Sequence, residues 1–76
     1  VMHNDDFTTM EFVVEILITI FNKGREEAAA LMMAVNKNQK AVVGTYSYDI
    51  ARTKAEEAER QARAEGFPFR LTVEEA

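Results

Sequence analysis

Apolar residues are concentrated in the first third of the chain, in a pattern that favours a helix. The segment from Met10 to about Phe21 is apolar around most of its circumference, which predicts a helix sandwiched between other elements. Thr8 and Glu11 have capping-box spacing, in which the threonine accepts from the Glu11 backbone and the carboxylate reaches back. The β-branched residues also fit a strand, but the length of the segment and its cap favour the helix.

Two more helices are predicted further along the chain. One begins at Arg25, carries acids in its first turn, and ends near residues 36–38. The other runs from a cap at Ser47 or Asp49 to about Glu65. Small residues can bring this last helix close to a sheet, along a seam formed by Ile50, Ala51, Ala55, Ala58 and Ala62.

Three segments have the character of strands: residues 1–3, 40–46 and 67–73. The last alternates apolar and polar positions, which predicts a half-buried strand. The resulting order is β-α-α-β-α-β, an α+β fold with three helices packed on a small three-stranded antiparallel sheet. A chain of 76 residues buries only about 60% of the surface it exposes when unfolded, so we expect one domain, residues 1–76, with a thin core.

Composition excludes several classes of function. The formal charge of −4 argues against a nucleic-acid surface, which needs clustered Lys and Arg. The chain has no Cys and one His, so thiolate chemistry and a Cys- or His-based zinc site are excluded, and we expect no cofactor. The apolar runs are too short to cross a bilayer. We therefore expect a cytoplasmic, monomeric protein with no metal.

The densest polar cluster is Asn4-Asp5-Asp6. On an extended segment Asn4, Asp6 and Thr8 would share a face and Asp5 would point away, which offers an amide, a carboxylate and a hydroxyl to an ammonium group. The plainer interpretation is a turn with a helix cap.

Two residue pairs at helical spacing could line a groove between the first two helices: Met10 with Val13, and Met32 with Val35. Simple core packing is the alternative. Lys54 lies in a run of charges that is either a solvated face or a partner surface.

Catalysis has little support in the sequence, and we expect no enzyme. An Asp5–Asp6 pair acting as acid and base is a further hypothesis, but no motif accompanies it.

Several runs of the chain closely resemble the ClpS family, the N-degron adaptors of the bacterial Clp protease: residues 4–14, 23–28, 31–35, 42–51 with 53–54, and 67–69 with 71–74. The resemblance implies an adaptor that holds a bulky hydrophobic first residue (Leu, Phe, Tyr or Trp) and delivers its protein to the AAA+ unfoldase ClpA. It also implies a flexible N-terminal extension that this sequence lacks.

The resemblance assigns roles to individual residues. Asn4 and Asp6 would bind the substrate α-amino group, together with Asn36, which stands where the family usually has His. Lys54 would contact the unfoldase. The pocket wall would be formed by Thr8, Met10, Val13, Met32, Val35 and Phe69.

A second resemblance, to the C-terminal domain of the ribosomal stalk protein, implies a different function. It would make the chain a protein-interaction domain with no role in degradation, although that relative lacks the Asn-Asp-Asp cluster.

Overall fold

A small antiparallel sheet lies at the centre of the fold. The computed structural model describes residues 1–75. β1 (Met2–His3) is the central strand, with β2 (Lys40–Ala41) on one side and β3 (Arg70–Leu71) on the other. The expected β-α-α-β-α-β order and the antiparallel sheet are confirmed. The strands are shorter than predicted, because each outer strand pairs only with the two residues of β1.

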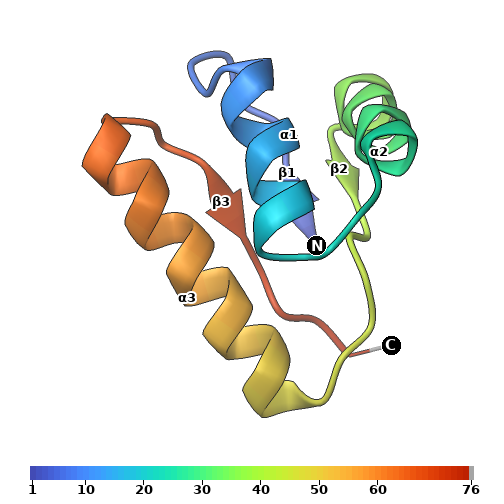
Figure 1. Cartoon of the computed structure of the whole chain (residues 1–76), viewed down its shortest axis with the longest axis vertical. Coiled ribbons are helices and arrows are strands. Elements are labelled where there is room, and N and C mark those ends of the chain that lie inside the picture. The colour runs from blue at the N-terminus through green and yellow to red at the C-terminus, as the bar shows by residue number, and fades with distance from the viewer. Residues whose placement is uncertain (76) are drawn as a thin grey trace.

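Three helices complete the architecture (Figure 1). They are α1 (Met10–Thr19), α2 (Arg25–Asn38) and α3 (Tyr48–Glu65). In the view of Figure 1, α1 lies in front of β1, with α2 on one side and α3 on the other. The bounds of α2 and α3 match the prediction, whereas α1 ends two residues before Phe21.

The register of the sheet decides which residues enter the core. Met2 lies opposite Ala41 and Leu71, and His3 lies opposite Lys40 and Arg70. Because side chains alternate across a sheet, these are two rows on opposite faces. The Met2 row faces the helices, and Met2 is completely buried. The buried apolar residues form one cluster: Met2, Val13, Ile16, Leu17, Phe21, Ala28, Met32, Val35, Val43, Ala58, Ala62, Phe69 and Leu71.

The start of α1 differs from the prediction. Thr9, not Thr8, is the N-cap, and its side chain accepts from the backbone N–H of Phe12 at 3.2 Å. The Thr8 hydroxyl donates to Asp5 at 2.8 Å, so it is engaged in the preceding turn. The predicted capping box between Thr8 and Glu11 was therefore wrong, because the Thr8 hydroxyl donates to the carboxylate of Asp5, three positions earlier, and Thr9 caps the helix in its place.

The prediction that α1 is sandwiched between other elements was also wrong. Val13, Ile16 and Leu17 face the core, but the Met10 side chain is 58% exposed. A single buried face is typical of a helix that lies on a sheet.

α3 packs through its alanines. Ala58 and Ala62 are fully buried, as the seam predicted, whereas Ile50 is 51% exposed. Ile50 precedes Ala51 by one residue and so lies about 100° away around the helix. On the inner side of α3, Glu59 Oε2 accepts from the backbone N–H of Leu71 at 3.1 Å, which ties the helix to β3.

We predict that serine has opposite effects on stability at two glycines. Gly24 is the N-cap of α2 with φ −73° and no side-chain hydrogen bond, whereas Gly66 ends α3 at φ +79°. An added Cβ meets no atom within 4 Å at either position. Gly24→Ser should raise the free energy of unfolding by about 0.5 kcal/mol through a new cap. Gly66→Ser should lower it by about 1 kcal/mol through left-handed strain. Urea denaturation measures both changes, and shifts of the same sign would contradict this account.

Candidate functional site

The loop between β1 and α1 is organised by the carboxylate of Asp5. Its Oδ1 accepts from the backbone N–H groups of Phe7 at 2.8 Å and Thr8 at 2.7 Å, and its Oδ2 accepts from the Thr8 hydroxyl at 2.8 Å. The chain bends over residues 6–8 as a result. The expectation that Asn4, Asp6 and Thr8 share one face was wrong, because alternation holds only on an extended segment and Thr8 turns toward Asp5.

This hydrogen bonding sets the charge of Asp5. Burial by itself would raise the pKa of Asp5, but the Thr8 and Phe7 N–H groups and the Thr8 hydroxyl together lower it below the ordinary 3.8. A carboxylate held in its ionised form is a poor general acid at neutral pH, so the loop does not favour the acid–base pair of Asp5 and Asp6.

The same loop is joined to the end of α2. The backbone N–H of Asn4 donates to the carbonyl of Gln39 at 2.8 Å, and Gln39 is the left-handed C-cap of α2. Asn36 lies one turn earlier on that helix. Asn4 is half-buried, whereas Asp6 and Asn36 are exposed. The structure therefore brings together the two segments that carry the expected amine-binding residues.

Most of the expected pocket wall is part of the core. The four wall residues Val13, Met32, Val35 and Phe69 are between 4% and 6% exposed and belong to the single apolar cluster. Met10 is exposed, and the Thr8 hydroxyl is engaged by Asp5. An apolar side chain that enters between α1 and α2 must therefore part residues that are packed against one another. Flexible Met32 is suited to such a movement.

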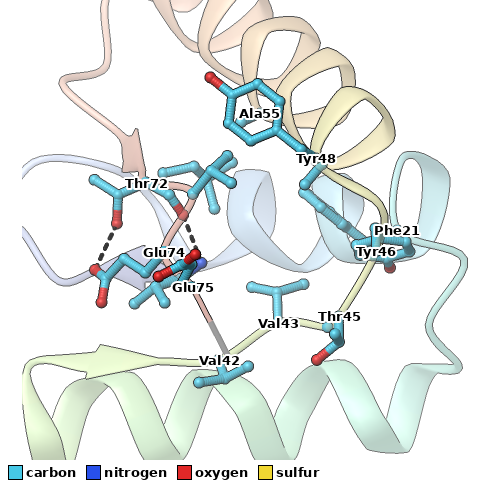
Figure 2. Close-up of a pocket in the computed structure, with 15 residues that line it drawn as sticks. Phe21, Val42, Val43, Thr45, Tyr46, Tyr48, Ala55, Thr72, Glu74 and Glu75 are labelled. Atoms are coloured by element: carbon cyan, nitrogen blue, oxygen red, sulfur yellow. Dashed lines mark hydrogen bonds between the residues drawn. The ribbon is translucent and has the colours of Figure 1, made fainter.

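One hollow on the surface lies away from these residues (Figure 2). It has a volume of about 440 Å³ and lies between the segment after β2, the start of α3 and the C-terminal residues. Figure 2 shows Val43 and Tyr48 among its lining residues. No residue of the expected wall lines it, and neither does Asn4.

A second, shallow hollow follows the outer flank of α1 and has a volume of about 520 Å³. It includes Met10, the one exposed member of the expected wall. The prediction from the sequence missed this groove because it placed α1 between other elements, with most of its circumference covered. The signal was present in the four-residue spacing of the apolar residues Met10, Val14 and Ile18.

Lys54 has partners inside the molecule. Its ammonium donates to the carbonyl of Ile20, the C-cap of α1, at 2.7 Å. The same nitrogen lies 5.4 Å from the ring centroid of Tyr46 and 5.9 Å from that of Phe21. A cation at a helix C-terminus, above two aromatic rings, stabilises the contact between α3 and α1. Its expected contact with an unfoldase stays a prediction.

Two further findings concern the described residues. Within residues 1–75, no three His, Asp or Glu side chains come together as a metal site would require. In the same range, no helix combines the length and apolarity that a bilayer crossing needs.

Replacing Asp5 should destabilise the protein in a pH-dependent way. A carboxyl with a lowered pKa adds stability above its unfolded pKa, near 3.8, and this contribution is lost as the pH falls through the folded pKa. Asp5→Asn should therefore cost about 1 kcal/mol at neutral pH and nearly nothing at strongly acidic pH. Denaturation at a series of pH values measures this difference. A loss that is the same at every pH would show that the charge of Asp5 has no role in the turn.

Lys54→Met should lower the free energy of unfolding by about 1 to 2 kcal/mol, because it keeps the apolar stem but removes the hydrogen bond and the cation. Lys40→Met, at an exposed position on β2, is the matched control and should change stability little. Thermal denaturation of both variants tests whether Lys54 stabilises the contact between α3 and α1. Equal stability of the Lys54 variant and the wild type would contradict it.

Comparison with known proteins supports one family along nearly the whole chain. The family model described as "ATP-dependent Clp protease adaptor protein ClpS" matches residues 1–72. The ClpS adapter protein of Neisseria gonorrhoeae is 53% identical over 72 residues, which are 95% of this chain and 69% of that protein. The ClpS adapter protein of Desulforapulum autotrophicum is 47% identical over 74 residues, or 97% of this chain and 71% of the relative.

A solved structure agrees with the sequence matches. The structure of Agrobacterium tumefaciens ClpS2 bound to L-phenylalaninamide superposes with a TM-score of 0.92 and 37% identity, covering 96% of this chain and 88% of that one. The fold and the sequence thus lead to the same conclusion. The chain belongs to the ClpS family of adaptor proteins of the ATP-dependent Clp protease.

Proposed function

We propose that the chain binds the first residue of proteins that begin with a bulky hydrophobic amino acid and a free α-amino group. Leu, Phe, Tyr and Trp are the expected first residues. The observation that carries this proposal is the hydrogen bond between Asn4 and Gln39, which joins the polar loop to the end of α2. It is further supported by the relative from Agrobacterium tumefaciens, whose bound L-phenylalaninamide has both an amine and a bulky apolar side chain.

The amine is bound by oxygen acceptors from the two segments. Asn4 and Asn36 offer carboxamide oxygens, and Asp6 offers a carboxylate, which suits an ammonium group with three donors. Within residues 1–75, no hydrogen bond engages the side chains of these three residues. They are therefore available to a ligand.

The side chain of the first residue is bound between α1 and α2. Met10 lies at the opening, and Met32, with Val13 and Val35, forms the wall. Burying a Leu or Phe side chain contributes about 1.5 to 3 kcal/mol. Each hydrogen bond to the ammonium contributes a similar amount. After ordering costs, and after the core contacts are parted, the sum corresponds to roughly micromolar affinity, which suits a reversible hand-off.

The bound substrate is then delivered to a ClpA-type AAA+ unfoldase for degradation. In this role the chain binds and transfers a protein in the cytoplasm, works as a monomer and catalyses no reaction itself. An interaction domain like that of the ribosomal stalk is the alternative, and the ClpS match over residues 1–72 makes it less favoured.

The test is a comparison of two fluorescent peptides that begin with Phe and differ only in acetylation of the first amine. The free peptide should bind at roughly micromolar concentration, and the acetylated one should bind at least tenfold more weakly, because it has lost the charge and donors of the ammonium. Fluorescence anisotropy measures both affinities. Equal affinity for the two peptides would reject the mechanism.

Matched variants locate the site. Asn36→Ala should weaken binding of the free peptide several-fold, whereas Asn38→Ala, two residues further along the exposed end of α2, should not change it. If neither variant changes the affinity, the end of α2 does not bind the amine.

A further inference from the structure

The outer flank of α1 is a partly open apolar surface within residues 1–75. Met10, Val14 and Ile18 follow one another at four-residue spacing along the flank and line the shallow groove. Phe12 lies on the other flank, where its ring meets Phe67 at a centroid distance of 5.1 Å. α1 therefore has one flank packed against the segment before β3 and one flank open on the side of α2, which contributes Arg25 to the groove.

Charged side chains of both signs border this groove, at different places along it. Glu11 and Glu15 lie beside its apolar stripe on α1, and Arg25, the first residue of α2, lies at its far end. Within residues 1–75, none of these three side chains forms a salt bridge. The near part of the groove thus presents negative charge without an internal partner, and it complements a basic side chain.

The groove begins where the proposed binding of the first residue takes place. Met10 lines it and also belongs to the expected wall for the first side chain. From Met10 to Ile18 the helix rises about 12 Å, at about 1.5 Å per residue. An extended peptide covers that length with about four residues, at about 3.4 Å each. A chain that leaves the first-residue site along α1 would therefore place its next four residues in the groove.

We propose that this groove binds residues two to five of the substrate. It favours an apolar side chain against Val14 and Ile18 and a basic one near Glu11 and Glu15. This inference rests on the proposed binding of free N-termini, and it adds a preference that extends beyond the first residue. Exposed charge pairs are weak, so the preference is expected to be about two- to fivefold in affinity.

The test uses peptides that share the first residues Phe-Ala and differ at residues three and four, with Leu-Lys, Leu-Glu or Ser-Ser there. The Leu-Lys peptide should bind about two- to fivefold more tightly than the Leu-Glu peptide at low salt, and the difference should shrink at high salt. Glu15→Gln should reduce the difference. Glu65→Gln removes the same charge at the end of α3 and should leave it intact.

A second measurement places the peptide on the protein. Amide chemical shifts of Val14, Glu15 and Ile18 should move further on titration with the Leu-Lys peptide than with L-phenylalaninamide, which has one residue only and can affect α1 only through the first-residue site. Equal affinities for the three peptides, with no such shifts, would show that the groove does not bind the substrate. Tight binding of the Phe peptides would in that case still support the proposed function. If no Phe peptide binds, the proposed function itself fails. If Glu15→Gln and Glu65→Gln changed the difference between the Leu-Lys and Leu-Glu peptides equally, the preference would come from the net charge of the protein. That result would also contradict binding in the groove.

Discussion

The packing of Met2 beneath the helices is the contact on which the rest of the molecule depends. β1 has two residues and pairs with a strand on each side, so its one inward side chain is surrounded by the whole core. A chain of this size has few apolar residues to bury, and thirteen of them form the single cluster. The core is therefore one cluster that the sheet and all three helices share.

The small size of the core also affects how a ligand could bind. Val13, Met32 and Val35, the expected wall residues between α1 and α2, are also core residues, so under the proposed function the contacts that hold the two helices together would also have to receive the first side chain. Parting these contacts would lower the net affinity for any ligand. A bulky apolar group would replace the lost contacts better than a small one, so the proposed binding would favour large first residues.

The sequence was sufficient to predict the helices, the order of elements and the antiparallel sheet, because hydrophobic periodicity and glycine positions are local signals. It was insufficient for the cap of α1, since Thr9 takes that position only because Asp5 engages Thr8. Periodicity also cannot separate a core residue from a pocket wall, because both need the same side chains. The hydrogen bond of Lys54 could not be predicted from the sequence for another reason. Its partner, Ile20, lies 34 positions away in the chain, and only the completed fold brings the Ile20 carbonyl to the ammonium.

The bond from Glu59 to the Leu71 amide also protects the border of the sheet. In antiparallel pairing, successive amides point to opposite sides, and Thr72 donates inward to the carbonyl of Val1. The amide of Leu71 therefore points outward, where a strand of another molecule could otherwise attach, and Glu59 occupies it. A helix that packs on the sheet thus also occupies an outward amide of β3 that a further strand would need for pairing.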